Sequence, residues 1–395
     1  MSDRRSVGLS ALWMVGLLAA CVAAHGGERK PDVHYVPTPP GVVAQMLKAA
    51  DVGKHDVVYD LGCGDGRIVI TAVGAFGARK GVGIDIDPKR IKESTENARK
   101  AAVRDRVAFL RQDLFDTDFS EATVVSLYLL QKLNHRLRPA LFRQLRPGDR
   151  IVSHAFDMGE WKPDKTVEVA GSDGNKGGTA YYWMLPGGAA GTWQWKLPGA
   201  DGEQTYRLRL RQRFQTVTGA LEIDGKEQPV SDARLLGDRL TLNLVREAKG
   251  EKARMAFAGR IAGNALSGKV ESEGFPLVGK REWTARRDPV NLVGAWRWTL
   301  NEKPATLRIQ SHDGRRYAAL TVGRRRIAVP QFYVWGAGVY FVVGRDIRQT
   351  YEGVVKGDRI VGTVIGDGEA GQGWTAERAP KTADKGSGRT KREKA

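Results

Sequence analysis

The chain has 395 residues, enough for two or three domains that each bury a core of their own. Its net charge is +18 at pH 7, and residues 191–395 account for +14 of that, which indicates two unlike halves, the second suited to an anionic surface or simply to solubility. Two cysteines and six scattered histidines exclude a disulfide scaffold, and we expect no metal site.

Residues 1–24 are typical of a targeting segment, with a basic start and an uncharged stretch that ends in small residues. Leu18-Ala-Ala-Cys21 fits a bacterial lipobox, in which Cys21 would be acylated. Val22-Ala-Ala24 offers an ordinary signal-peptidase site instead, and an uncleaved membrane anchor is the third interpretation. All three predict a protein of the cell envelope, exported or membrane-anchored.

The stretch from Val57 to Arg67 organises the first half of the chain. A short β-rich run is followed by Gly62, Gly64 and Gly66, and then by an apolar run that suits a helix. Glycines let the backbone turn sharply and approach a ligand closely, and the helix that follows points unpaired N–H groups at whatever lies over the loop. The pattern indicates a cofactor loop.

Acidic residues end the next two predicted strands. Asp85 lies 19 residues after Gly66, where a nucleotide-binding βαβ unit places its ribose carboxylate. Asp113 ends the following strand, and a fourth apolar strand at 122–127 runs into Tyr128. NAD-binding proteins share the first two features, but their usual glycine spacing is G-x-G-x-x-G, not the G-x-G-x-G present here.

Together these residues resemble motifs I to IV of the class I S-adenosylmethionine-dependent methyltransferases. Tyr35-Val-Pro-Thr38 ahead of a helix, and the run from Asp60 to Ile70, further resemble the ATP synthase c-subunit lysine methyltransferase family and its bacterial relatives, over residues 33–186. The resemblance implies S-adenosylmethionine as the cofactor and Asp85 as the ribose ligand.

The same resemblance implies an adenine-edge pair at Asp113 and Leu114. Tyr128 leaves the fourth strand beside the transferable methyl and is the candidate catalytic residue, whereas His154 is interpreted as structural. The implied cofactor-binding residues are Tyr35, Asp60, Gly62, Cys63, Gly64, Asp65, Gly66, Asp85, Asp113 and Leu114.

Residues 33–186 predict an α/β fold with a seven-stranded doubly wound, Rossmann-like sheet. Strands alternate with helices up to a fifth strand at 150–155, and the runs 166–170 and 179–185 then form an antiparallel pair. A leucine every fourth residue over 129–145 predicts an amphipathic helix.

Helical periodicity disappears after a Gly-rich boundary at 187–191. About eight short β-like runs fill residues 191–287, and the pattern recurs over 291–379. Gly-x-Trp at each start and an arginine near each end are similar to lipocalin-like calycins and favour two closed up-and-down barrels, with two antiparallel sandwiches as the alternative. The matching segments are Gly191-Thr-Trp193 with Gly294-Ala-Trp296, and Trp283-Thr-Ala-Arg286 with Trp374-Thr-Ala-Glu-Arg378.

Residues 381–395 are basic with almost no apolar content, so a disordered tail is expected there. The arginines of 207–213 alternate with leucines, as on the solvated face of a strand, so no specific nucleic-acid partner is predicted. The absence of a Pro-Pro-Tyr/Phe motif after the fourth strand argues against DNA adenine methylation.

The function implied by the resemblance is S-adenosylmethionine-dependent N-methylation, with a protein lysine as the favoured acceptor. Two alternatives stay open. One is a small-molecule methyltransferase. The other is a non-enzymatic envelope protein whose barrels hold an apolar ligand, with the methyltransferase fold as a relic. Membrane association through the N-terminus is a further expectation.

Overall fold

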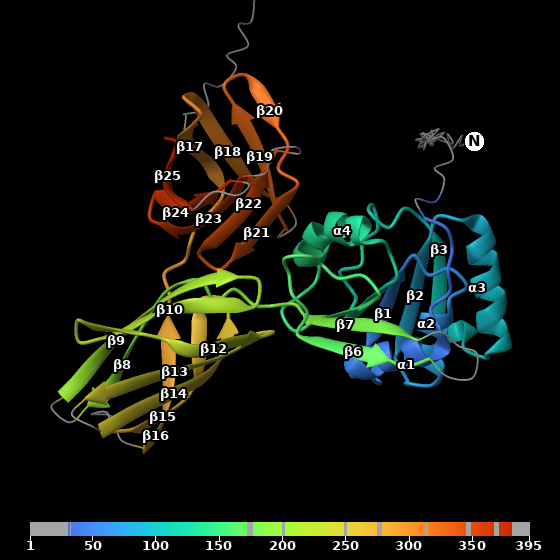
Figure 1. The fold of residues 1–395 in the computed structure, drawn as a ribbon, viewed down its shortest axis with the longest axis horizontal. Helices are drawn as coiled ribbons and strands as arrows, with labels where there is room; N and C mark the ends of the chain where they lie inside the picture. The colour runs from blue at the N-terminus through green and yellow to red at the C-terminus, as the bar shows by residue number, and fades with distance from the viewer. Residues whose placement is uncertain are drawn as a thin grey trace, which may run out of the picture.

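The computed structural model describes residues 31, 33–171, 177–199, 202–248, 251–274, 279–312, 315–344, 349–366 and 371–380. The expected signal at 1–24 and the basic tail at 381–395 lie outside the described residues. Within the described part of the chain, no helix is both long and apolar enough to cross a bilayer. Figure 1 shows an α/β domain, coloured blue to green, and two β bodies, one yellow-green and one orange to red.

The α/β domain contains one seven-stranded sheet of order β3-β2-β1-β4-β5-β7-β6. The first five strands of that order are parallel, and β7 is antiparallel to both β5 and β6. The predicted doubly wound sheet is confirmed. The elements are α1 (Pro40–Ala49), β1 (Val57–Leu61), α2 (Arg67–Gly74), β2 (Lys80–Asp85), α3 (Pro88–Lys100), the 3₁₀ helix η1 (Arg104–Arg106), β3 (Val107–Arg111), β4 (Val124–Leu127), α4 (Gln131–Gln144), β5 (Arg150–His154), β6 (Lys165–Val169) and β7 (Gly178–Met184).

The two faces of this sheet are covered differently. Side chains alternate along a strand, so Val58 packs with α1, α2 and α3, whereas Val57 and Tyr59 face the opposite layer. That opposite layer contains the leucines of α4 together with aromatic residues from the β bodies, among them Phe214 and Tyr333. The β bodies therefore help to bury a sheet face that α4 covers only in part.

Each β body is a nine-stranded antiparallel sheet in which the first strand pairs with the last. Barrel 1 has the order β11-β10-β9-β8-β16-β15-β14-β13-β12, and barrel 2 has the order β20-β19-β18-β17-β25-β24-β23-β22-β21. Barrel 1 comprises β8 (Gly191–Gly199), β9 (Gly202–Arg213), β10 (Thr216–Ile223), β11 (Lys226–Pro229), β12 (Ser231–Leu236), β13 (Arg239–Ala248), β14 (Glu251–Ala262), β15 (Ala265–Glu273) and β16 (Gly279–Arg286). Barrel 2 comprises β17 (Gly294–Leu300), β18 (Lys303–His312), β19 (Arg315–Val322), β20 (Arg325–Ile327), β21 (Gln331–Trp335), β22 (Gly338–Val343), β23 (Gln349–Lys356), β24 (Arg359–Ile365) and β25 (Gln372–Arg378).

These barrels differ from the expected eight-stranded closed ones. Each has nine strands, and in the described residues no ladder joins β11 to β12 or β20 to β21. Pro229 ends β11 and Pro330 directly precedes β21. Proline cannot donate to a ladder, so a proline at each seam favours an open edge there. The barrel-like fold class is confirmed, with one unpaired seam in each copy.

The repeated tryptophans occupy equivalent sites. Trp193 and Trp296 are fully buried, and the indole N–H of each donates to the carbonyl four residues earlier, at 2.8 Å and 2.9 Å. An arginine covers each indole, Arg287 at 4.3 Å from the ring centroid of Trp193 and Arg378 at 4.2 Å from that of Trp296. The residue of barrel 1 that is equivalent to Arg378 is thus Arg287. The sequence match had indicated Arg286, one residue earlier.

Aromatic side chains fill the interior of both barrels. In barrel 1 the rings of Trp195 and Trp283 lie 4.8 Å apart, and Phe257 meets Trp283 edge-on at 5.2 Å. In barrel 2 the rings of Phe341 and Tyr351 stack at 4.7 Å. This packing gives no structural support to the expectation of an apolar ligand inside the barrels.

A buried arginine ties barrel 2 to the α/β domain. Arg138 on α4 is 1% exposed, and its guanidinium donates to Tyr333 Oη at 2.9 Å and to Gln331 Oε1 at 2.5 Å. Glu160 accepts from Arg213 of barrel 1 at 2.6 Å and from Tyr340 Oη of barrel 2 at 3.1 Å. Both barrels are therefore anchored beside α4 by hydrogen-bonded charges as well as by aromatic packing.

Candidate active site

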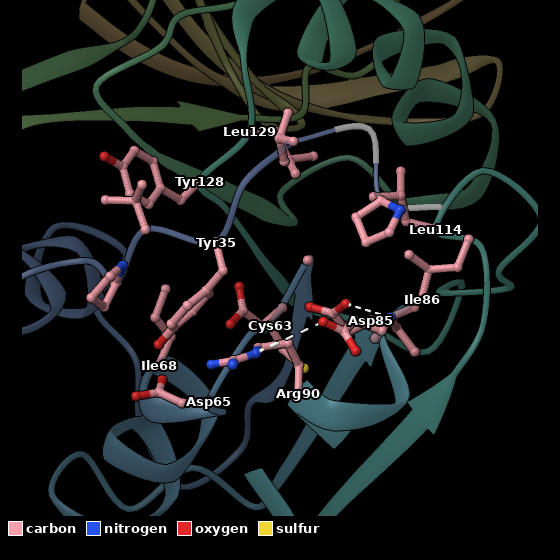
Figure 2. A pocket seen from close by; sticks show the side chains of 18 of the residues that line it. Tyr35, Cys63, Asp65, Ile68, Asp85, Ile86, Arg90, Leu114, Tyr128 and Leu129 are labelled. Carbon is pink, nitrogen blue, oxygen red and sulfur yellow. Dashed lines mark hydrogen bonds and ion pairs between the residues drawn. The ribbon is translucent and has the colours of Figure 1, made fainter. Parts of the chain in front are cut away.

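A cavity of about 450 Å³ opens at the carboxyl ends of β1, β2, β3 and β4. Figure 2 shows its walls, with Tyr35 and Tyr128 on one side and Ile86 and Leu114 on the other. Nine of the eleven predicted site residues line it: Tyr35, Asp60, Gly62, Cys63, Asp65, Asp85, Asp113, Leu114 and Tyr128.

Asp85 holds the glycine loop in place. Its Oδ2 accepts the backbone N–H of Gly64 at 2.9 Å, and its Oδ1 accepts that of Asp87 at 2.9 Å. An ionised carboxylate has about four acceptor positions, so two remain for hydroxyl groups in the cavity. Asp87 in turn caps α3 by accepting the N–H of Lys89 at 2.8 Å, and this fixes the chain directly beyond Asp85.

The other two predicted glycines serve the packing of the loop. Gly64 has φ +53°, and a Cβ placed there would overlap the ring of Tyr35. A Cβ at Gly66, where φ is +80°, would meet Phe109 at 2.7 Å and Ser94 at 2.8 Å. Both positions therefore require glycine because neighbouring protein side chains pack directly against the backbone there. This requirement holds whether or not a ligand also contacts the loop.

Two groups beneath the loop are desolvated. Asp60 is 2% exposed and accepts the hydroxyl of Ser126 at 2.7 Å, and burial raises its pKa to about 7. Burial also raises the pKa of the Cys63 thiol, so this cysteine is an unreactive small residue. The floor of the cavity thus carries an acid that can exchange its proton near neutral pH.

Arg67 and Arg90 form an outer wall that the sequence did not assign. Arg67 donates to both oxygens of Asp65, at 3.0 Å and 3.1 Å from Nε, and to the carbonyl of Thr38 at 2.9 Å. The guanidinium of Arg90 lies 4.5 Å from the ring centroid of Tyr35. Partial burial, with the nearby carboxylate of Asp65, raises the pKa of Tyr35 to about 12, so its hydroxyl stays protonated.

Tyr128 belongs to a second corner of the cavity. Its ring centroid lies 4.0 Å from that of His154, whose Nδ1 is 3.3 Å from the hydroxyl of Thr38. Burial lowers the pKa of His154, which favours the neutral imidazole. Leu129 and Leu133, from the start of the leucine repeat, supply apolar walls next to this corner.

Two residues of the cavity wall were missed by sequence reasoning, and His154, interpreted as structural, packs against a third residue that was predicted. Arg67 directly follows the glycine loop, and Arg90 follows the Asp85-x-x-Pro88 turn. Both arginines are thus close in sequence to strand ends, and this could have indicated that they line the cavity. His154 ends β5, and only the packing shows that it supports Tyr128. Across the part of the chain that the structure describes, no group of three or more His, Cys, Asp or Glu side chains could hold a metal ion.

The cavity fits a nucleoside-type cofactor. Its volume lies in the range of small-molecule pockets, and its walls are largely apolar with a few convergent polar groups. Five aspartates line it, Asp60, Asp65, Asp85, Asp87 and Asp113, and only two arginines, Arg67 and Arg90. This excess of acidic groups suits a ligand that carries an ammonium and a sulfonium.

The comparisons with known proteins agree with this geometry. The model of the ANTKMT methyltransferase domain matches residues 60–165. A protein-lysine N-methyltransferase of Saccharolobus islandicus is 45% identical over 155 residues, which are 39% of this chain and 95% of that protein. An ATP synthase c-subunit lysine N-methyltransferase of Xenopus laevis is 29% identical over 136 residues, 34% of this chain and 59% of that protein.

Among solved structures, an RNA methyltransferase from Salinibacter ruber in complex with S-adenosyl-L-homocysteine is 55% identical, with a TM-score of 0.36. The alignment covers 38% of this chain and 93% of that one. The resemblance drawn from the motifs is confirmed, and S-adenosylmethionine is the cofactor. The chain therefore belongs to the family of the Saccharolobus islandicus protein-lysine N-methyltransferase, and it is an S-adenosylmethionine-dependent methyltransferase.

Proposed function

We propose that the protein methylates the side-chain nitrogen of a lysine in another protein. The observation that carries the proposal is the 45% identity to a protein-lysine N-methyltransferase along 95% of that protein's length. The family model and the ATP synthase c-subunit methyltransferase relative support the same acceptor class.

The residues at the strand ends provide the cofactor contacts in this proposal. Asp85 accepts hydrogen bonds from the ribose hydroxyls, and Asp113 with Leu114 contacts the adenine edge. The loop from Asp60 to Gly66 lies under the methionine part, and Tyr35 closes that side. The cofactor supplies a methyl group that its sulfonium already activates, so the protein's task is mainly orientation.

The acceptor side is the corner formed by Tyr128, Leu129 and Leu133. A lysine must be neutral to attack, and its unperturbed pKa is about 10.4. The apolar side chains of Leu129 and Leu133 lower that pKa by desolvation, so no strong base is needed. Tyr128, whose ring packs against His154, contacts the incoming amine in this proposal.

A labelling experiment tests this proposal. Cell extract is incubated with the protein and methyl-tritiated S-adenosylmethionine, and the protein fraction is hydrolysed and analysed for methylated lysines. Asp85→Ala is the matched control, and we expect labelled methyl-lysine with the wild type that falls about tenfold or more with the control. Label confined to small molecules would show that the methyl acceptor is a small molecule. Label removed by ribonuclease would show that the acceptor is RNA. Either result would contradict a lysine acceptor.

We also propose that the protein acts at the cell envelope, on the strength of the Leu18-Ala-Ala-Cys21 motif. Cell fractionation of the wild type and of Cys21→Ala tests this, with Cys63→Ala as the matched control because Cys63 is the other cysteine. We expect only Cys21→Ala to move from the membrane to the soluble fraction. Membrane retention of that variant at full precursor mass would indicate an uncleaved anchor instead.

A further inference from the structure

A second cavity, of about 160 Å³, lies between α4 and barrel 2. Three arginines meet at it: Arg143 from the C-terminal turn of α4, and Arg315 and Arg316 from the start of β19. Its remaining walls are mostly aromatic and are formed by Phe142, Phe332, Tyr333 and Val334. The cavity is separate from the cofactor site, which lies at the other end of α4.

The positive charge at this cavity is poorly neutralised. Arg315 pairs with Asp118 at 3.0 Å, but Asp118 is 64% exposed, so the pair is largely solvated. Arg143 has the ring of Tyr317 as a neighbour, 5.7 Å from its guanidinium. Among the described residues, neither Arg143 nor Arg316 has a carboxylate partner.

The electrostatic environment agrees with this geometry. Burial lowers the pKa of Arg143, and the charge of Arg315 lowers it further. Burial alone lowers the pKa of Arg316. Both arginines are partly buried. A guanidinium that is partly withdrawn from water without a counter-charge is destabilised, so a bound anion would be stabilised here more than at a fully exposed arginine.

We propose that Arg143, Arg315 and Arg316 form a binding site for a phosphate group. Guanidinium groups match the geometry of tetrahedral oxyanions through paired N–H donors, and three of them around a small aromatic-walled cavity favour phosphate over a bulky ligand. The group can belong to a soluble phosphate compound or to a phospholipid headgroup. Because the site joins α4 to barrel 2, an occupied site also fastens the two together.

Titration with inorganic phosphate tests the site on the full chain. Calorimetry is done at constant ionic strength with the wild type, Arg143→Gln, Arg316→Gln and the matched control Arg324→Gln, which alters an exposed arginine in the turn after β19. We expect Arg143→Gln and Arg316→Gln each to bind phosphate at least about tenfold more weakly, with Arg324→Gln unchanged. Absence of binding to the wild type, or equal binding by all four proteins, would overturn the proposal.

Thermal unfolding keeps the test valid if a variant is poorly folded. Removing an uncompensated charge should leave the Tm of Arg316→Gln in phosphate-free buffer at or above the wild-type value. Phosphate should then raise the Tm of the wild type and of Arg324→Gln, but not that of Arg316→Gln. A phosphate-induced rise of the same size in Arg316→Gln would contradict the site.

Vesicles of phosphatidylcholine with phosphatidylglycerol distinguish the two sources of the phosphate group. Co-sedimentation that drops for Arg316→Gln but not for Arg324→Gln assigns the site to a lipid headgroup. Equal co-sedimentation, together with the phosphate titration above, assigns it to a soluble phosphate compound.

Discussion

The α/β domain and the two barrels use their interiors in opposite ways. At the strand ends of the α/β domain, five aspartates line an open cavity of about 450 Å³. In the barrels, inward-facing positions are filled by stacked and edge-on aromatic rings. The chemistry therefore belongs to the α/β domain, while the barrels contribute packing against its sheet and a charged surface beside α4.

The largest effect is expected at the glycine loop. Gly64→Val should abolish cofactor binding, because φ +53° strains a branched side chain and its Cβ would displace the Tyr35 ring. Gly77→Val is the matched control, since Gly77 also has a positive φ, +72°, but nothing lies within 4 Å of its Cβ position. Calorimetric binding of S-adenosylmethionine measures both, and equal losses would show that backbone strain alone explains the effect.

Replacing a buried barrel tryptophan should lower the stability of the protein without changing its cofactor affinity. Trp296→Ala removes a fully buried indole under Arg378, and we expect the free energy of unfolding of barrel 2 to fall by about 3–5 kcal/mol. Denaturant unfolding followed by circular dichroism measures this, with Trp296→Phe as the milder control. Cofactor affinity should stay at the wild-type value, and a parallel loss of affinity would refute the division between the two regions.

Asp85 should have an intermediate effect on the cavity. Hydrogen bonds to a charged group contribute about 1.5–3 kcal/mol, so Asp85→Ala should weaken cofactor binding about ten- to hundredfold. The loss includes the anchoring of the Gly64 N–H by the same carboxylate. Asp105→Ala, at an exposed acid on η1, serves as the control in the same titration. If Asp85→Ala bound the cofactor with unchanged affinity, the assignment of Asp85 as the ribose ligand would be wrong.

Tyr128 should show the smallest effect. Tyr128→Phe keeps the ring that packs on His154 and removes only the hydroxyl, so cofactor affinity should be preserved. One lost hydrogen bond of about 1 kcal/mol corresponds to roughly fivefold in kcat. Steady-state kinetics on the methylated acceptor measure it, with Tyr181→Phe on β7 as the control. A kcat equal to that of the wild type would make Tyr128 a packing residue.

The sequence allowed the residues that line the cavity at the strand ends to be predicted, because spacing along βαβ units fixes which residues reach those ends. Asp85 and Asp113 illustrate this, and both line the cavity. Gly-x-Trp repeats likewise predicted the two barrels, although the ninth strand of each and the unpaired seams at Pro229 and Pro330 were not expected.

Contacts between distant segments could not be predicted in this way. Arg138 follows Leu137 in an amphipathic helix, and no local pattern distinguishes it from a solvated arginine. Its burial depends on Gln331 and Tyr333, almost two hundred residues further along the chain. The Arg143–Arg315–Arg316 cluster arises from the same docking and is equally invisible in the sequence.

The position of the bound cofactor decides whether the strand-end carboxylates have the roles assigned to them. A crystal structure with bound S-adenosyl-L-homocysteine should place its ribose hydroxyls about 2.6–3.2 Å from the carboxylate of Asp85, with the adenine edge at Asp113 and Leu114. The sulfur should face the corner of Tyr128 and Leu133. A ribose bound away from Asp85, or a ligand bound outside this cavity, would contradict the assignment.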